Sequence, residues 1–555
     1  MNVFFFFFFF FFFFFFFFFF FFFYFFFFFE WVIFGMNSSF FTCIFLFDWV
    51  SLIFMSFVFL ISGSVLFYSI GYMSGDLNLI RFYYFVFLFI LSMVFFILMP
   101  DLICMLLGWD GLGLVSYCLI IYYSNFNSST SGLITVFMNR FGDVFLILSI
   151  GWFLNFGSWH FVLMVDYFDF DFFFLVYLIL MASFTKSAQF PFCFWLPLAM
   201  AAPTPVSSLV HSSTLVTSGV YLIIRFNCYI YYFDTFFLMI ISLITMFISG
   251  VNACVENDLS KIIAFSTLSQ IGFMFFVLSF GSFTICFMHL LIHAVFKSLL
   301  FLCSGIFIHF FFGDQDIRRM GGLVIQSPYV SSCFFVSLLC LCGFPFFSGF
   351  YSSDFIFELV VLGDTNFFFF FFFCISIGLT VIYSFRLLYY LFFSNSFFFP
   401  LISFSYCFYM NYSLFFLFFF SLFGGSFIFW LFSDFIFVVS MFYKLVPLFL
   451  FFFFLVFFFN FLNNFFFFCS SFFFFFFGSM WFLNFFSSSF FLSRFFGFSS
   501  FSYMLVDSGW FEYFISGSLA GFFNFLFVYF EKFFLSSFHI YLVSFFLFFF
   551  FMFLI

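Results

Sequence analysis

The amino-acid sequence predicts an all-α protein that crosses a membrane repeatedly, with about 14–16 transmembrane helices. Of its 555 residues, 68% are hydrophobic and only 6% are charged, whereas an ordinary soluble domain carries roughly 25% charged residues. A membrane-spanning helix needs about 20 apolar residues, and apolar stretches of that length recur along the whole chain. A soluble globular fold is therefore excluded.

The expected spans are separated by short polar segments. We place them near residues 4–29, 31–47, 51–72, 82–100, 102–123, 132–154, 172–190, 205–226, 235–254, 262–280, 283–311, 330–357, 366–392, 414–440, 445–468 and 539–555. Phenylalanine occupies 154 positions, including every position from Phe4 to Phe29 except Tyr24. Lipid-facing positions need only be apolar, so this bias indicates a T-rich genome such as that of an organelle.

Two segments carry helix-breaking residues within apolar surroundings. Gln189 to Pro205 contains four prolines, and Gly343 to Gly349 contains Pro345. Broken helices at membrane depth are tolerated where they line a polar cavity, and paired broken helices point to a transporter built from inverted repeats. We therefore predict two related bundles of about five helices, at 81–230 and 231–395, after N-terminal spans at 1–80 and before low-complexity C-terminal helices at 396–500.

Composition also excludes several kinds of binding site. The net charge is −9 and only 12 residues are Lys or Arg, so there is no basic patch for nucleic acid. The 14 cysteines lie singly, except Cys340 and Cys342, without the clustering that zinc or iron–sulfur sites need. We expect no metal and no cofactor in this chain. The N-terminus carries no import or secretion signal, as expected of a protein made inside its organelle.

Lys186 is the clearest candidate for a functional group. Between Asp171 and Arg225 the only acidic, Lys, Arg or His residues are Lys186 and His211. A charged side chain at the centre of a membrane helix costs about 2.5–3.5 kcal/mol on insertion scales, and such residues usually serve transport. The alternative is a lysine that snorkels to the interface.

Three ionisable residues follow at helical spacing. His289, His293 and Lys297 lie at i, i+4 and i+8, and so share one face of one helix within an apolar stretch. Imidazole titrates near neutral pH, so three such groups on one stripe favour a proton relay. A single membrane histidine would more often be a packing residue.

Acidic residues supply candidate partners. Asp110 lies nine residues after Asp101 in the sequence, and therefore about 13 Å deeper along a helix. A buried carboxylate needs a partner, and Lys186 is the expected one; a structural anchor is the alternative. Other charged residues sit at predicted helix entrances, where they serve either in the network or as caps: Arg140, Asp143, Glu256, Asp258 and Lys261.

At these residues the sequence resembles the subunit 5 family of respiratory complex I, which is related to Mrp-type cation/proton antiporters. The motifs that carry the resemblance occur in the family's order: GWDGLGLVSYCLI, NRFGDV, KSAQFPFCFWLPLAMAAPTPVSSLVHSSTLVTSGVYLIIRF, NDLSKIIAFSTLSQIGFM, HLLIHAVFKSLLFLCSG, QDIRRMGGL and GFPFFSGFYSSD. The match runs from about Asp48 to Arg386. VDSGWFEYF resembles the entry to the family's lateral helix, so the resemblance implies a lateral helix and a last span at 501–555.

The resemblance implies an antiporter-like fold and a proton-translocating role. By the resemblance, Asp110 takes the place of the family's carboxylate partner and Lys186 that of its switching lysine. His211 would then relay protons toward the centre of the membrane domain, and the hydrated proton path would continue through His289, His293 and Lys297. The resemblance also implies sibling antiporter-like subunits, membrane lipids and an inner mitochondrial membrane. Other subunits would hold FMN, iron–sulfur clusters and ubiquinone, so that the chain is part of an NADH:ubiquinone reductase without its own redox centre.

The chain departs from the family pattern at two positions. Asp110 replaces the usual Glu, and Ser353 replaces the lysine of the family's FYSKD motif. The neighbouring Asp354 and Glu358, at i and i+4, are expected to replace that lysine as proton acceptor and donor, because two close carboxylates cannot both ionise cheaply; a hydrated structural anchor is the alternative. An Mrp-type antiporter and a scaffold subunit with impaired pumping remain alternative functions.

Overall fold

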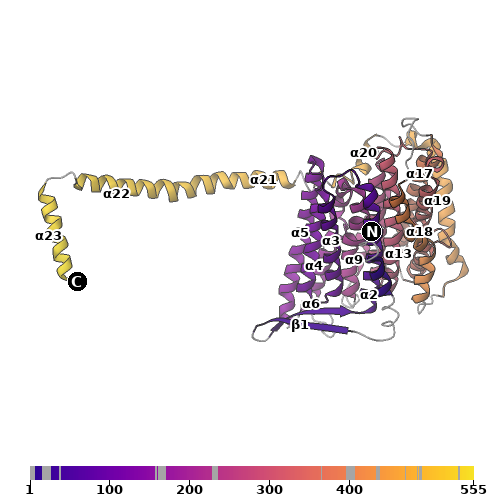
Figure 1. The fold of residues 1–555 in the computed structure, drawn as a ribbon, viewed down its shortest axis with the longest axis horizontal. Helices are drawn as coiled ribbons and strands as arrows, with labels where there is room; N and C mark the ends of the chain where they lie inside the picture. Colours follow the sequence, from indigo (N-terminus) through magenta and orange to yellow (C-terminus); the bar gives the residue numbers. More distant parts are fainter. Residues whose placement is uncertain are drawn as a thin grey trace. The chain divides into compact units, whose positions relative to one another are not determined.

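Helices that run side by side make up most of the protein in the computed structural model (Figure 1). The structure describes residues 7–15, 27–36, 39–156, 159–160, 170–227, 235–363, 365–395, 407–432, 438–468, 471–483, 485–486, 491–534 and 538–554. The chain divides into two compact units, Met1–Trp481 and Phe482–Ile555.

The first half of the larger unit contains six long helices and a chain of short ones. The long helices are α2 (Trp49–Tyr72), α3 (Leu79–Leu98), α4 (Leu102–Ile120), α5 (Phe126–Phe153), α6 (Phe170–Lys186) and α9 (Leu215–Arg225). Between α6 and α9 lie η3 (Phe192–Phe194), α7 (Trp195–Leu198), η4 (Ala199–Ala201), α8 (Thr204–Val206) and the π-helix η5 (Ser207–Thr214), and η1 (Leu154–Phe156) extends α5.

The second half of this unit continues the bundle. It contains α11 (Phe236–Val255), α12 (Leu259–Ser279), α13 (Phe283–Phe310), α14 (Leu323–Gln326), α15 (Pro328–Cys342), α16 (Ser348–Leu362), α17 (Phe367–Leu388) and the π-helix η6 (Tyr389–Phe393). The last helices of the unit are α18 (Phe408–Leu431), α19 (Met441–Phe468) and α20 (Ser471–Gly478). The chain is thus an all-α, multi-pass membrane protein apart from one hairpin.

Within the described residues, 12 helices are long and apolar enough to cross a membrane. Four shorter apolar segments accompany them: Phe173–Lys186, Phe192–Ala201, Pro328–Cys342 and Phe538–Phe553. Phe173–Lys186 and Phe192–Ala201 lie at the first helix break, and Pro328–Cys342 ends at the second.

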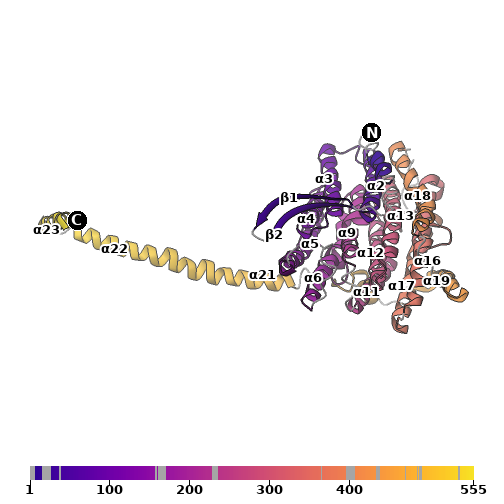
Figure 2. The ribbon, with the colours of Figure 1, turned by 90° about the horizontal axis from the view of Figure 1, so that it is seen from below.

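A β-hairpin replaces one predicted span. β1 (Phe27–Met36) pairs antiparallel with β2 (Ser39–Phe47), from Phe27 opposite Phe47 to Met36 opposite Ser39. The expected helix at 31–47 is therefore wrong, and the span expected at 4–29 is helical only at 7–15 within the described residues before it enters β1. Aromatic and β-branched residues favour strands as readily as they suit lipid. Figures 1 and 2 show the hairpin across one end of the bundle.

Both predicted helix breaks are present. The chain is irregular between the end of α6 at Lys186 and the start of α8, and again between α15 and α16. At the second break Gly343 has a left-handed backbone, which terminates α15. Gly349 passes so close to α15 that a Cβ atom there would lie 1.8 Å from the Cys340 carbonyl oxygen. The inverted relation between the two halves stays a prediction.

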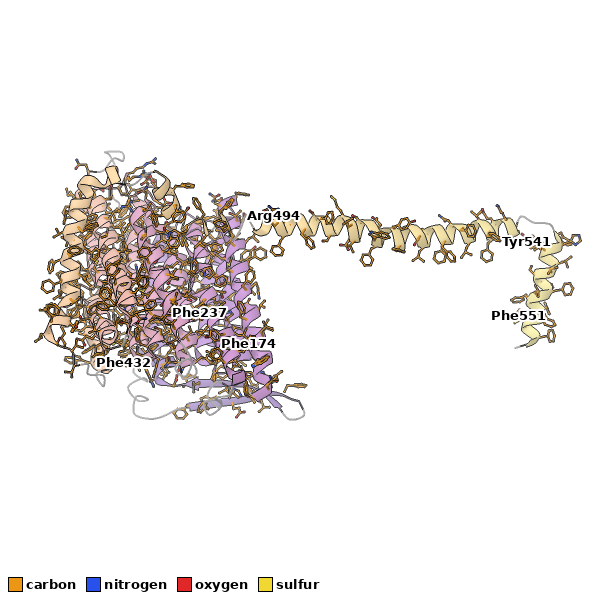
Figure 3. The ribbon with its side chains drawn as sticks, turned by 180° about the vertical axis from the view of Figure 1, so that it is seen from behind. Phe174, Phe237, Phe432, Arg494, Tyr541 and Phe551 are labelled. Atoms are coloured by element: carbon orange, nitrogen blue, oxygen red, sulfur yellow. The ribbon has the colours of Figure 1, made fainter. Side chains whose placement is uncertain are left out.

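Aromatic side chains cover the outside of the bundle. Phe174 of α6 and Phe237 of α11, both labelled in Figure 3, are exposed at 52% and 41% of their surface. The interior also contains many buried hydroxyl groups, and most of those on helices bond to a carbonyl three or four residues earlier in the same helix. The backbone carbonyls of the same helix thus satisfy these hydroxyl groups without water.

The smaller unit is a long helix followed by a short one. α21 (Phe491–Ser502), the π-helix η8 (Tyr503–Ser518) and α22 (Leu519–Phe534) form one continuous helix, and α23 (Phe538–Leu554) follows. A helix of 40 residues, Ser493–Lys532, is about 60 Å long, twice the roughly 30 Å thickness of a bilayer core. Its side chains are mostly exposed, as expected of a surface that lipid or partner subunits cover.

One buried ion pair ties the first helices together. Arg225, at the end of α9, forms a two-pronged contact with Asp48, which caps α2. Arg225 also donates from Nε to the Tyr221 hydroxyl at 2.8 Å, and that hydroxyl donates to the Ile97 carbonyl at 2.8 Å. The arrangement joins α2, α3 and α9, with both charged side chains more than 90% buried.

We predict that Arg225→Met strongly destabilises the protein, because it leaves the Asp48 carboxylate buried without its partner. Removing one member of a buried pair costs about 3–5 kcal/mol. The measurement is the midpoint of thermal inactivation of the detergent-solubilised protein. The Asp48→Asn/Arg225→Met double variant should recover part of the loss, and Arg318→Met, which breaks an exposed pair with Asp316, should leave the midpoint unchanged. An unaltered midpoint for Arg225→Met would contradict this account.

Candidate functional site

Lys186 lies at the end of α6, at the first helix break, and its side chain is fully buried. Nζ donates a hydrogen bond of 2.5 Å to the backbone carbonyl of Trp109 on α4. It also lies 3.8 Å from the centre of the Trp109 ring, whose electron-rich face attracts cations. The carboxyl end of a helix favours positive charge as well. The lysine is thus held by groups that carry no full negative charge.

Trp109 connects Lys186 with the nearby carboxylate of Asp143. Trp109 Nε1 donates to Asp143 Oδ1 at 2.9 Å, and Asp143 Oδ2 pairs with Arg140 at 2.9 Å on α5. Arg140 also contacts Asp110 Oδ2 at 3.5 Å. Among the described residues, no carboxylate oxygen lies within 4.0 Å of Lys186 Nζ. The four ionisable residues therefore form a chain rather than a direct pair.

The order of this chain differs from the expected partnership. The sequence predicted that Lys186 pairs with Asp110. In this conformation Asp110 instead contacts Arg140, and Asp143 is linked to Lys186 through Trp109. Asp143 was expected only in a supporting role. Its position one turn after Arg140 on the same helix is the sequence signal for the Arg140–Asp143 ion pair. The roles of both acids in proton transfer stay predictions.

His211 occupies the π-helix η5, a few residues beyond the prolines of the first break. Its imidazole is fully buried, and neither ring nitrogen contacts a hydrogen-bonding group of the described protein. The Trp195 ring lies edge-on at 6.2 Å, and Trp195 Nε1 donates to the Thr185 carbonyl beside Lys186. π-Helical turns are frequent at functional sites. A buried imidazole needs polar partners, so water is the partner that fits His211.

The stripe predicted on α13 is completely buried. His289 and His293 have ring centres 6.3 Å apart, and Lys297 lies one further turn along the helix. Lys297 Nζ donates to the Ser266 hydroxyl of α12 at 2.6 Å. Within the described chain neither ring nitrogen of His293 has a protein hydrogen-bond partner. His293 therefore resembles His211 in having no hydrogen-bond partner among the described residues.

His289 is held in a way that suits either protonation state. Nε2 lies 3.0 Å from the Gln270 side-chain oxygen, and Nδ1 lies 2.9 Å from the Ser352 hydroxyl. With a neutral ring, Nε2–H donates to Gln270 and the Ser352 hydroxyl donates to Nδ1. With a charged ring, both nitrogens donate, and the Ser352 hydroxyl turns to the Gly349 carbonyl, 3.1 Å away. A proton can thus arrive or leave without moving heavy atoms.

A cavity adjoins His289 at the second helix break. It offers about 70 Å³ of space to water, enough for several molecules at roughly 10–15 Å³ each. Its polar lining comes from α12, α13, α16 and α17: Ser269, Gln270, His289, Ser353, Asp354, Ser376 and Thr380. The cavity therefore brings the α13 stripe together with the carboxylate that follows Ser353.

Glu358 has a basic partner that the sequence did not predict. Glu358 is buried, and its Oε1 lies 3.4 Å from Nζ of Lys444 on α19. Asp354 lies one turn before Glu358 on α16. Because Lys444 lies in the phenylalanine-rich C-terminal part, far from Glu358 in the sequence, local spacing gave no signal for the contact.

The remaining supporting residues lie at a helix entrance. Lys261 and Asp258 form a half-exposed pair at 2.5 Å at the start of α12. Nearby, Arg386 of α17 donates to the Glu256 carbonyl at 2.5 Å and to the Asn257 side-chain oxygen at 2.6 Å. Burial raises the pKa of the Glu256 carboxyl in this loop. The Arg386 contacts hold the loop between α11 and α12. Asp258 stands at the N-cap position of α12 without a side-chain cap hydrogen bond, and the network and capping roles of these charged residues stay predictions.

Three sequence families match successive parts of the chain. Residues 31–83 match "NADH-Ubiquinone oxidoreductase (complex I), chain 5 N-terminus", residues 99–380 match "NADH:quinone oxidoreductase/Mrp antiporter, TM", and residues 383–555 match "NADH dehydrogenase subunit 5 C-terminus". The matches cover the candidate site and the C-terminal helices alike.

Several relatives carry the name NADH-ubiquinone oxidoreductase chain 5. The protein of Locusta migratoria is 53% identical over 363 residues, which cover 65% of this chain and 64% of the locust protein. That of Anopheles quadrimaculatus is 50% identical over 408 residues, covering 72% and 70%. That of Lumbricus terrestris is 46% identical, covering 64% and 62%. The matched part thus spans less than two thirds of the locust and earthworm proteins.

Two solved assemblies share the fold. The Mrp complex from Dietzia sp. DQ12-45-1b superimposes with a TM-score of 0.68 at 22% identity, covering 77% of this chain and 50% of that one. The membrane-bound sulfane sulfur reductase, an archaeal respiratory membrane complex, gives 0.63 at 20% identity, covering 72% and 67%. At such identities the likeness establishes the fold alone.

Proposed function

The chain belongs to the NADH-ubiquinone oxidoreductase chain 5 family, and we propose that it translocates protons across the mitochondrial inner membrane as a membrane subunit of respiratory complex I. NADH oxidation and ubiquinone reduction take place in other subunits, which hold FMN, iron–sulfur clusters and ubiquinone. The chain contributes a proton path and no redox centre. A gene in the organelle accounts for the phenylalanine bias.

The observation that carries the proposal is Lys186 at a helix break. This fully buried ammonium has a carbonyl and an aromatic face as its immediate contacts, and no described carboxylate pairs with it directly to fix its charge. The acids of the adjoining network carry that charge at a distance, and they share Arg140. Rearrangement of Arg140 would therefore change the negative charge that Lys186 experiences, and with it the affinity of Nζ for a proton.

The proton path would continue through the two histidines that lack protein partners. His211 lies beyond the first break, and His293 lies between His289 and Lys297 on α13. Water bridging these rings would connect Lys186 with Lys297, and His289 would pass protons into the cavity beside Asp354. Imidazoles titrate near neutral pH and so suit such steps.

Sibling antiporter-like subunits are the proposed partners. The described side chains of α21 to α22 are mostly exposed and largely apolar, so we infer that this helix lies against other membrane subunits and lipid as a lateral helix. The C-terminal family match at residues 383–555 favours complex I over an Mrp-type antiporter. Co-purification with flavin and iron–sulfur proteins would support complex I, and co-purification without them would support the antiporter.

The first test of the proposed function is Lys186→Met, which keeps an apolar side chain of similar volume. The complex should assemble and oxidise NADH, but its proton-to-electron ratio in reconstituted vesicles should fall, because the titrating amine is gone. Thr185→Val, in the preceding residue, is the matched control and should pump normally. A normal ratio for Lys186→Met would remove this lysine from the mechanism.

A second test separates the two acids of the network. Asp110→Asn and Asp143→Asn should each lower the proton-to-electron ratio less than Lys186→Met does, since they remove charge near the lysine but leave the amine. Asp143→Asn should have the larger effect of the two, because only Asp143 is linked to Lys186 through Trp109. If Asp110→Asn has no effect while Asp110→Ala prevents assembly, Asp110 is a structural anchor.

The second break gives a third test. Asp354→Asn or Glu358→Gln should lower the proton-to-electron ratio, because each removes a carboxylate that can hold a proton, whereas Ser353→Ala should not. Normal pumping by both carboxamide variants would show that these acids only anchor α16. Loss of pumping in Ser353→Ala alone would instead favour a relay of hydroxyl groups and water.

A further inference from the structure

Lys444 lies in the first turn of α19, which packs against α16 and α17. Its Nζ is 3.4 Å from Glu358 Oε1, and 42% of its side chain is exposed. One turn later in α19, Pro447 lines the cavity that contains Asp354, as do Leu448 and Phe451. The helix that supplies this cation therefore forms part of the cavity wall.

The carboxylates that face Lys444 lie on α16. Glu358 is 8% exposed, and Asp354, which precedes it by one turn, lines the cavity. Residues four apart on a helix share a face, so the two acids are neighbours. In the described chain, Lys444 is the only Lys or Arg side chain within 4.0 Å of either acid. Lys444 is therefore paired with Glu358, and Asp354 is the neighbouring acid.

Position 353 carries no charge in this chain. The Ser353 hydroxyl lines the cavity and donates to the Phe350 carbonyl of the same helix, 3.4 Å away. The break is thus built with a carboxylate pair and without a cation from the same helix. The positive charge comes instead from Lys444 on α19.

We propose that Lys444 is a positioning residue for proton release at the second break, and that it supplies the positive charge that Ser353 cannot. This inference rests on the proposed function. A proton that enters the cavity by way of His289 forms an O–H bond with one carboxylate of the pair. The Lys444 ammonium then stays with the carboxylate that is still ionised. When the O–H proton passes to water, both acids are ionised again and compete for the same cation.

The partial exposure of Lys444 suits this exchange. A side chain of four methylene groups can swing between acids one helical turn apart, about 6 Å along the axis. An ion pair of 3.4 Å at a partly exposed site is also weak compared with a buried two-pronged pair. Lys444 can therefore change partner without breaking a strong contact. A lysine that served only to hold α16 and α19 together would need a fixed contact.

The test compares four variants of the assembled complex in vesicles, with the proton-to-electron ratio and its pH profile as readouts. Lys444→Met should lower the ratio while NADH oxidation continues, and Lys444→Arg should keep it. Adding Ser353→Lys to Lys444→Met should restore the ratio, because position 353 lines the same cavity. Arg81→Met, which removes an exposed cation from the first turn of α3 without an ion-pair partner in the described structure, should pump normally.

Several outcomes would overturn the proposal. A wild-type ratio and pH profile for Lys444→Met would show that the cation is not used. Assembly of the Ser353→Lys/Lys444→Met variant without recovered pumping, or failure of both Met-containing variants to assemble, would show that Lys444 is a strut between helices. If Lys186→Met lowers the ratio and Lys444→Met does not, only this inference fails. If neither variant lowers it, the proposed function fails too.

Discussion

The cost of placing a charge at membrane depth governs the structure. On insertion scales one ammonium or carboxylate at the centre of a span costs about 2.5–3.5 kcal/mol, so the chain provides specific contacts for each charged group that it buries. Arg225 and Asp48 satisfy one another completely and join three helices. Lys186 and Lys297 are treated differently, because each has neutral contacts and no acid within ion-pair distance in the described structure.

This difference separates structural charges from candidate transport groups. A fully paired charge is stable in one state and has no reason to exchange its proton. A lysine that contacts a carbonyl and a ring face, or a hydroxyl, can lose its proton without leaving a carboxylate unpaired. His289 shows the same adaptability, since the Ser352 hydroxyl can either donate to its ring or accept from it. Broken helices provide the room for such groups, because they open the backbone next to Lys186 and beside the cavity at α16.

Sequence reasoning located these groups where the chemistry is local. Lys186 stood out because it interrupts a long apolar run, the α13 stripe because its spacing is helical, and the two breaks because proline and glycine cannot continue a helix. The carboxylates near Lys186 were identified as residues, but the link of Asp143 to Lys186 through Trp109 was not, since contact between α4, α5 and α6 depends on tertiary packing. Lys444 could not be predicted at all, because nothing in its own sequence neighbourhood refers to Glu358.

The hairpin illustrates a different limit. Residues 31–47 are mostly apolar and rich in Phe, with the β-branched residues Val32, Ile33, Thr42 and Ile44 among them, a composition that suits a membrane helix and a strand equally well. A helix and a strand are normally told apart by the period of their apolar residues, and a run in which almost every residue is apolar has no period. The pairing of Phe27–Met36 with Ser39–Phe47 is decided by the partner strand and by packing of β2 near the ends of α3 and α4, where Cys43, Met99 and Cys104 form a small cluster.

The central claim is that the buried ionisable groups are joined by water into one proton path. The most direct measurement is a structure of the assembled complex at a resolution that shows ordered water around Lys186, His211, His293 and Lys297. We predict water molecules within hydrogen-bond distance of the ring nitrogens of both histidines. These waters should form a hydrogen-bonded chain that connects the two lysines and continues to the cavity beside Asp354. Histidines enclosed only by apolar side chains, with no water between the lysines, would contradict the account.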